Sequence, residues 1–120
     1  MINHEQLINK ISSAEDYYSK SYTESLERWL IACNATGASI DSIQFSRGEN
    51  KNFSLNFAIL GDKCAKNTLL HVAGTHGVEG YLGAAIQLLS LELIGNLPQD
   101  INVVFIHSLN PWGMANLRRV

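Results

Sequence analysis

The chain has 120 residues, enough for one modest domain. A domain of this size buries roughly two-thirds of the surface that its unfolded chain exposes. The formal net charge is -2 and the basic residues are scattered, apart from one arginine pair, which argues against a dedicated nucleic-acid-binding protein. No apolar stretch reaches the roughly 20 residues that a membrane-spanning helix needs. We therefore expect a cytoplasmic protein that has neither nucleic acid nor a membrane as its partner.

The N-terminal part, residues 1–37, is predicted to be a helical segment that packs on a sheet. Residues 1–12 are a polar lead-in with the composition of a short helix, and residues 13–33 are predicted to form an amphipathic helix with Ser13 as its N-cap. Apolar and aromatic side chains recur there at three- and four-residue steps, which is the spacing of a core-facing helix. They are Tyr17, Tyr18, Tyr22, Leu26, Trp29, Leu30 and Cys33.

Residues 38–60 are predicted to form a β-hairpin at the edge of a sheet. Residues 38–45 and 53–60 carry apolar side chains at strand spacing, and the second run alternates strictly between apolar and polar residues. The intervening residues 47–52 are polar and include a glycine, as expected for a turn. Cys33 and Cys64 lie far apart in the sequence and match neither a metal-binding nor a disulfide pattern, so we expect two free thiols that are buried or half-buried.

A strand, helix and strand unit follows the hairpin. Residues 68–73 and 101–106 are mainly apolar or β-branched and do not alternate with polar residues, which favours strands that are buried on both faces. They flank a buried helix over residues 81–94, and such a crossover unit has parallel strands. The fold class is therefore α/β, with a mixed sheet flanked by helices over residues 38–120. We expect at most one long helix on each face, and an incomplete sheet, because folds of this kind normally have more strands and helices.

Polar side chains follow both parallel strands at the same edge of this sheet, where open α/β sheets place their chemistry. The turn that follows the first strand holds His76 and Glu79, three residues apart. Residues at this spacing on a helical turn share a face, with Cβ atoms about 5–6 Å apart. Both side chains could then reach one cation at about 2.0–2.2 Å. His107, Ser108 and Asn110 follow the second strand.

The same residues also have structural interpretations. Glu79 could complement the dipole of the following helix, with His76 as a polar loop residue. His71 lies inside an apolar strand and is expected to be a hydrogen-bonded core or sheet histidine. His107 could act as a nearby third metal ligand, although a structural role is favoured. The glycines of the turn match neither form of phosphate-binding loop.

Several motifs together resemble the zinc carboxypeptidase superfamily. They are Thr75-His76-Gly77-Val78-Glu79-Gly80, a buried helix, a strand, and Leu109-Asn110-Pro111-x-Gly113 followed by Arg118-Arg119. Within the superfamily the motifs are similar to those of a bacterial branch of carboxypeptidase-like proteins, which is related to aspartoacylase and succinylglutamate desuccinylase. The resemblance covers roughly residues 38–120 and implies a carboxypeptidase-like (phosphorylase/hydrolase-like) fold.

The resemblance also implies roles for individual residues. Zinc would be the cofactor, with His76 and Glu79 as its first two ligands. Arg118 or Arg119 would stabilise an oxyanion or hold a substrate carboxylate through two parallel hydrogen bonds. Asn110 is expected to contact the substrate, which would be a peptide or an N-acyl amino acid. The glycines at positions 74, 77 and 80 would let the backbone turn tightly against the ion.

Other residues that the family needs have no counterpart in this sequence. In such proteins the third zinc ligand, an Asn-Arg pair and the general-base glutamate come later in the chain. The sequence therefore predicts the N-terminal portion of a zinc-dependent hydrolase of amide bonds, which binds zinc weakly and hydrolyses nothing by itself. The alternative is a non-catalytic, truncated relative that self-associates as a homo-oligomer through an exposed sheet edge.

Overall fold

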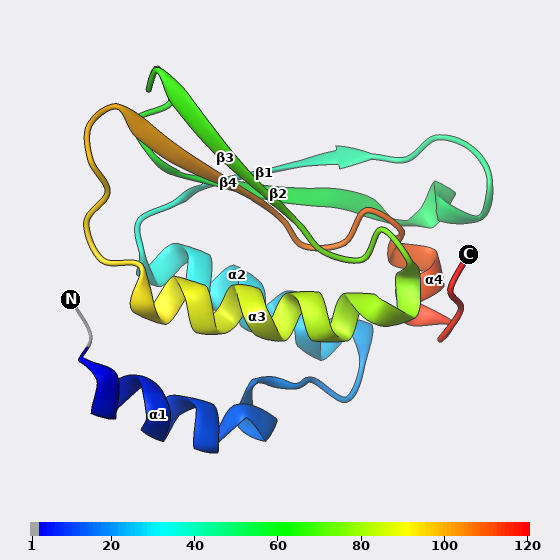
Figure 1. Cartoon of the computed structure of the whole chain (residues 1–120). Helices are drawn as coiled ribbons and strands as arrows, with labels where there is room; N and C mark the ends of the chain where they lie inside the picture. The colour runs from blue at the N-terminus through cyan, green and yellow to red at the C-terminus, as the bar shows by residue number, and fades with distance from the viewer. Residues whose placement is uncertain (1–2) are drawn as a thin grey trace.

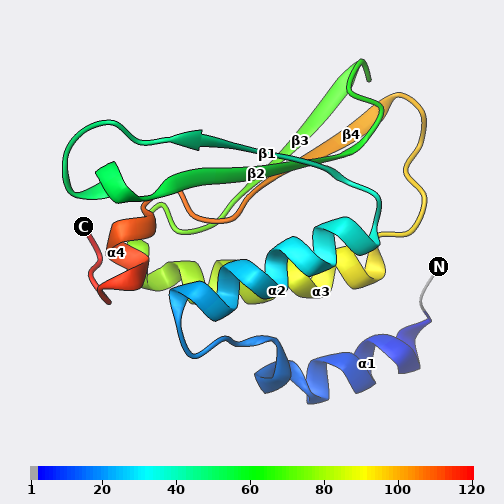
Figure 2. The same cartoon turned by 180° about the vertical axis from the view of Figure 1, so that it is seen from behind.

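The computed structural model describes residues 3–120, and its long helices lie on one side of a mixed four-stranded sheet (Figures 1 and 2). In chain order the elements are α1 (His4–Ser12), η1 (Ala14–Tyr17), α2 (Tyr22–Ala35), β1 (Ser39–Gln44), η2 (Glu49–Asn52), β2 (Ser54–Gly61), β3 (Asn67–Val72), η3 (Gly77–Glu79), α3 (Gly80–Leu93), β4 (Ile101–Ile106) and α4 (Pro111–Ala115). The predicted α/β class, a mixed sheet with flanking helices, is confirmed. Within residues 3–120 no helix combines the length and the apolar character needed to cross a membrane.

The strand order of the sheet is β1-β2-β4-β3. β1 and β2 form the predicted antiparallel hairpin, and β3 and β4 are parallel, as expected for a crossover through α3. Because β4 lies between β2 and β3, β3 is an edge strand, and the prediction that residues 68–73 are buried on both faces is wrong. Leu69 and Leu70 are 61% and 57% exposed. The prediction relied on an apolar run without alternation. Such a run is typical of a central strand, but an edge strand has a neighbour on one side only and so remains more exposed.

Both long helices, α2 and α3, pack side by side against the same face of the sheet (Figures 1 and 2). The expectation of one long helix on each face is therefore wrong. The core between helices and sheet consists of Trp29, Cys33, Ala58, Leu88, Leu91, Val103 and Phe105. Cys64 lies in the turn between β2 and β3 and is exposed, so the expectation of a buried or half-buried thiol is wrong for it. Strand alternation turns Phe57, Leu70 and Val104 to the opposite face, which no helix of the described residues 3–120 covers.

The helix predicted over residues 13–33 is divided in two. Ser13 does not cap it, because its hydroxyl donates hydrogen bonds back to Asn9 and Lys10 at the end of α1. The longer helix α2 begins only at Tyr22, where the Ser21 hydroxyl accepts a hydrogen bond from the Glu24 amide at 3.2 Å. The start of α2 is thus set by the serine that satisfies the free amides of its first turn.

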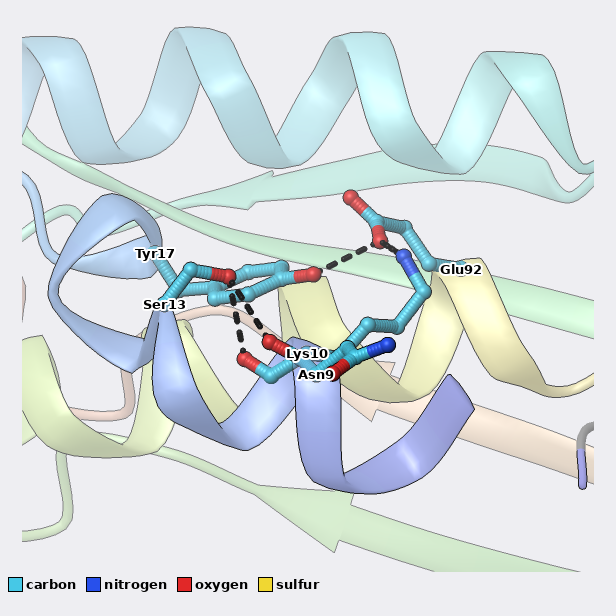
Figure 3. Close-up of polar contacts among 5 residues, drawn as sticks. All are labelled: Asn9, Lys10, Ser13, Tyr17 and Glu92. Carbon is cyan, nitrogen blue, oxygen red and sulfur yellow. Dashed lines mark hydrogen bonds and ion pairs between the residues drawn. The ribbon is translucent and has the colours of Figure 1, made fainter. Parts of the chain in front are cut away.

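The N-terminal helix α1 lies beyond α3, on the side away from the sheet (Figure 1). Figure 3 shows how Glu92 of α3 joins the two: its carboxylate accepts hydrogen bonds from the Lys10 ammonium and, at 2.7 Å, from the Tyr17 hydroxyl. The hydrogen bond from Lys10 is the main cause that lowers the pKa of Glu92. None of the α1 side chains is buried, and the contacts of Glu92 that join α1 and η1 to α3 lie at the surface.

Candidate metal site

The turns that follow β3 and β4 are joined along their backbones. The Leu109 amide donates to the Ala73 carbonyl at 2.9 Å, and the next amide donates to the Gly74 carbonyl at 2.8 Å. A Cβ on Gly74, whose φ is +63°, would lie 2.4 Å from the Ser108 hydroxyl, and a Cβ on Gly77 would lie 2.2 Å from the carbonyl carbon of Gly113. Gly74 and Gly77 therefore allow the backbones of the two turns to approach each other closely. The family resemblance had instead implied that these glycines let the backbone turn tightly against a metal ion.

The end of the chain folds back onto the turn after β3. Leu117 follows α4 with φ +54°, a left-handed conformation that reverses the chain at the end of a helix. The carbonyls of Arg118 and Arg119 then accept hydrogen bonds from the amides of Val78 and Gly77, both at 2.9 Å. These two backbone bonds place the arginine pair directly beside η3.

The two predicted metal ligands and one arginine meet at this turn. His76 Nδ1 lies 3.2 Å from Glu79 Oε2, Arg119 Nε lies 3.4 Å from Glu79 Oε1, and Arg119 Nη2 lies 3.5 Å from His76 Nδ1. The hydrogen bond with His76 is the main cause that lowers the pKa of Glu79, and Arg119 adds to it. All three side chains are solvent-accessible, with 38% of the His76 side chain exposed, 59% of Glu79 and 66% of Arg119.

The donor atoms of His76 and Glu79 fit two adjacent positions around a tetrahedral ion. With bonds of about 2.0–2.1 Å, two ligand atoms of such an ion lie about 3.3 Å apart, and the observed separation is 3.2 Å. The guanidinium of Arg119 is the cation that contacts both side chains in this structure. Among residues 3–120, however, no group of three or more His, Cys, Asp or Glu side chains could hold a metal ion. Because zinc sites normally have at least three protein ligands, we expect weak binding.

His107 lies away from this pair, in the core. It is fully buried, its Nε2 lies 2.9 Å from the Ser25 hydroxyl, and the rings of Tyr22 and Trp29 pack against it. Burial lowers its pKa to about 4. Its Nδ1 has no hydrogen-bond partner within the described part of the chain. The arrangement agrees with the structural role that was favoured for His107, and it does not bring the ring to His76.

The remaining predicted site residues have backbone or capping roles in this structure. The Asn110 side chain accepts a hydrogen bond from the Gly113 amide at 3.0 Å and so caps α4. Arg119, and not Arg118, is the arginine whose side chain contacts His76 and Glu79. Substrate contact by Asn110 remains a prediction.

Sequence reasoning missed one polar residue of the core, Gln87. It is 0% exposed, and its side chain connects Trp29 on α2 with His71 on β3. The sequence signal was available, because Gln87 is a lone amide within an apolar helix, and buried amides in proteins are almost always hydrogen-bonded. His71 is a hydrogen-bonded sheet histidine, as expected.

Comparison with known proteins identifies the family of this α/β domain. Residues 18–120 match the family described as "Protein of unknown function (DUF2817)", and the chain belongs to this family. The matched range includes the whole sheet, both long helices and the turn with His76 and Glu79, and it begins after α1 and η1. No curated protein and no solved structure matches the chain.

Proposed function

We propose that the chain is the N-terminal part of a zinc-dependent hydrolase that cleaves amide bonds, of the carboxypeptidase or acyl-amino-acid deacylase type within the zinc carboxypeptidase superfamily. The observation that carries the proposal is the 3.2 Å separation of His76 Nδ1 and Glu79 Oε2 beside the carboxyl ends of two parallel strands. When bound, zinc supplies a water of lowered pKa and polarises the carbonyl to be cleaved.

The residues of this chain would divide the work as follows. His76 and Glu79 hold the ion, and Arg119 offers a planar pair of donors to a substrate carboxylate or an oxyanion. A peptide or an N-acyl amino acid has both the amide and the carboxylate that such a site needs. The free thiols of Cys33 and Cys64 are consistent with a cytoplasmic compartment, where disulfides are rare.

Zinc titration by calorimetry tests the ligand pair. We expect about one equivalent to bind weakly to the wild-type chain, and we expect binding to be lost in both His76→Ala and Glu79→Gln. His4→Ala is the matched control, because His4 is exposed on α1 and should leave binding unchanged. Zinc binding that is equal in wild type and His76→Ala would refute the site. Tight binding would instead mean that a second copy supplies another ligand, since His107 is buried.

The second part of the proposal is that this chain alone has no hydrolase activity. A site with two ligands and no third donor among residues 3–120 holds its ion too weakly for turnover. The measurement is hydrolysis of acylated amino acids and short peptides in the presence of zinc, with and without a chelator. Chelator-sensitive turnover that disappears in Glu79→Gln would show that the chain is a complete enzyme.

The free edge of β3 favours a second candidate, a non-catalytic module that self-associates. β3 carries no charged residue and exposes Leu69 and Leu70, whereas the other edge strand, β1, carries Asp41. Charged side chains are one of the devices that keep sheet edges apart, and β3 lacks them. Two copies could pair their β3 strands and so continue the sheet.

Sedimentation velocity at tens of micromolar separates the two candidates. Self-association predicts a dimer for the wild type and a monomer for Leu70→Lys, which places a charge on the edge strand. Ile31→Lys is the matched control, because Ile31 is 69% exposed on α2, away from the sheet edge. A wild-type chain that sediments as a monomer would eliminate the self-associating module.

A further inference from the structure

A groove of about 370 Å³ runs from the candidate metal ligands along the space between β3 and α3. The residues that line this groove include His71, Gly74, His76, Glu79, Leu82 and Ile86. The groove therefore connects the pair His76 and Glu79 with a second histidine, His71, which belongs to β3. A ligand bound at the metal ligands could extend to His71 without leaving the groove.

Gln87 fixes the orientation of this second histidine. Trp29 Nε1 can only donate, and it donates to Gln87 Oε1 at 2.7 Å, so the amide nitrogen must point the other way. That nitrogen donates to the Ile106 carbonyl at 2.9 Å, and it lies 3.0 Å from His71 Nδ1 and 3.2 Å from the His71 carbonyl, which share its second hydrogen. Gln87 and Trp29 are both fully buried, so the core holds the amide in place.

The amide also selects the tautomer of the His71 ring. Because the Gln87 nitrogen is a donor, His71 Nδ1 must accept, and the proton of the neutral ring is on Nε2. The ring packs at 5.8 Å from the Phe105 ring, measured between centroids, which further limits its rotation. Nε2 makes no hydrogen bond within residues 3–120, and His71 is half-buried and lines the groove, so Nε2–H is available as a donor to a ligand.

The wall between the two histidines is apolar. Leu82 and Ile86 lie one turn apart on α3, both line the groove, and they are 51% and 46% exposed. Residues at this spacing share one helix face. An aliphatic group in the groove would remove both side chains from water.

We propose that this groove is a subsite for a short peptide with an aliphatic side chain, which packs on Leu82 and Ile86 while His71 Nε2–H donates to a peptide carbonyl or carboxylate. The inference rests on the proposed function of the His76 and Glu79 pair. Four residues of chain lie between the two histidines, and the five Cα–Cα steps that join them span at most about 18 Å when extended. A peptide has an acceptor at the far end of such a span, whereas a fatty acyl chain has none there.

Binding of N-acetyl-leucyl-leucine to the full chain tests the subsite. We expect His71→Phe, which keeps an aromatic ring but removes the donor, to weaken binding about five-fold, the usual worth of one hydrogen bond. Leu82→Ser, an exposed position that should not affect folding, is expected to weaken binding as well, while Ile31→Ser on α2 leaves it unchanged. Unchanged binding in either groove variant would overturn the proposal.

Three further measurements make the outcome specific. The ¹⁵N shifts of the His71 ring should show Nε2 protonated and Nδ1 unprotonated, and the opposite tautomer would overturn the assignment. N-octanoylglycine should bind more weakly than the dipeptide, and equal or tighter binding would assign the groove to acyl chains instead. Repeating the titration with His76→Ala and without zinc separates the two proposals, because His71-dependent binding that survives there supports the subsite even if the metal site fails.

Discussion

The turns after β3 and β4 both start at the same edge of the sheet, but one places its histidine at the surface and the other places its histidine in the core. Both follow parallel, neighbouring strands, and each carries a histidine at the same edge of the sheet. The His76 side chain is 38% exposed and meets Glu79 and Arg119, whereas His107 is fully buried against α2. Topology brings both histidines to one edge, but the layer that packs above each turn decides which of them can meet a ligand.

The largest expected effect comes from breaking the contact between the two turns. Gly77→Ala would place a Cβ 2.2 Å from the carbonyl carbon of Gly113, and neither backbone can move without disturbing the other turn. We expect a loss of more than about 3 kcal/mol in the free energy of unfolding, at the upper end of overpacking costs. Urea denaturation measures it, and zinc binding should be lost in parallel.

Gly95→Ala is the matched control for this substitution. Gly95 has φ +54° but nothing within 4 Å of its missing Cβ, so the variant reports the left-handed backbone alone. That cost is about 1–2 kcal/mol. If Gly77→Ala were no worse than Gly95→Ala, the two turns would not be packed as tightly as the structure indicates.

The second-largest expected effect concerns His107, the buried histidine of the two turns. Burial lowers the pKa of His107 from 6.5 to about 4, so between these values the unfolded chain binds more protons than the folded one. The stability that neutral His107 contributes is complete above pH 6.5 and is lost as the pH falls to about 4. At 1.36 kcal/mol per pKa unit, the loss is about 3 kcal/mol.

Urea denaturation at a series of pH values checks this expectation. The useful window is pH 6.5 to about 4.5, because the lowered carboxyl pKa values of Glu79 and Glu92 begin to contribute below it. His107→Phe should be less stable than the wild type at pH 7 and should show a flatter pH dependence. His4→Ala, at an exposed histidine, should retain the wild-type slope. A wild-type slope in His107→Phe would contradict the burial argument.

The sequence predicted the parts of this fold that depend on neighbouring residues. The alternation of β2 gave the hairpin, and the strand, helix and strand pattern gave the parallel pair of β3 and β4. The position of β3 at the edge was not predictable, because an apolar run looks the same whether one or both neighbours are present. The face on which α2 packs was also hidden, since its apolar stripe fits either side of a sheet.

In the candidate site too, the features that depend on neighbouring residues were predictable and those that depend on distant parts of the chain were not. The spacing of His76 and Glu79 predicted their proximity, because three residues in a helical turn determine it. The choice between Arg118 and Arg119 was not predictable, since it depends on a chain reversal at Leu117, where no glycine signals a left-handed residue. The burial of His107 depends on α2, whose Ser25 bonds the ring and is 82 residues away in the sequence.

The smallest expected effect concerns the exposed turn. The Arg119 guanidinium lies within 3.5 Å of His76 Nδ1 and bonds Glu79, so a metal ion and this cation compete for the same two side chains. Removing the charge in Arg119→Gln should tighten zinc binding about two- to five-fold, the usual range for an exposed ion pair. Calorimetry at low and high salt measures it, and the difference between the variants should shrink at high salt.

Arg118→Gln is the control that makes this small effect interpretable. Arg118 has the same charge and a neighbouring backbone bond to η3, but its side chain does not contact the pair. Equal gains in both variants would mean a general charge effect at the turn, and no competition by Arg119. Weaker zinc binding in Arg119→Gln would mean that the guanidinium holds Glu79 in position for the ion. The sign of the change therefore decides whether Arg119 excludes the metal ion or prepares its site.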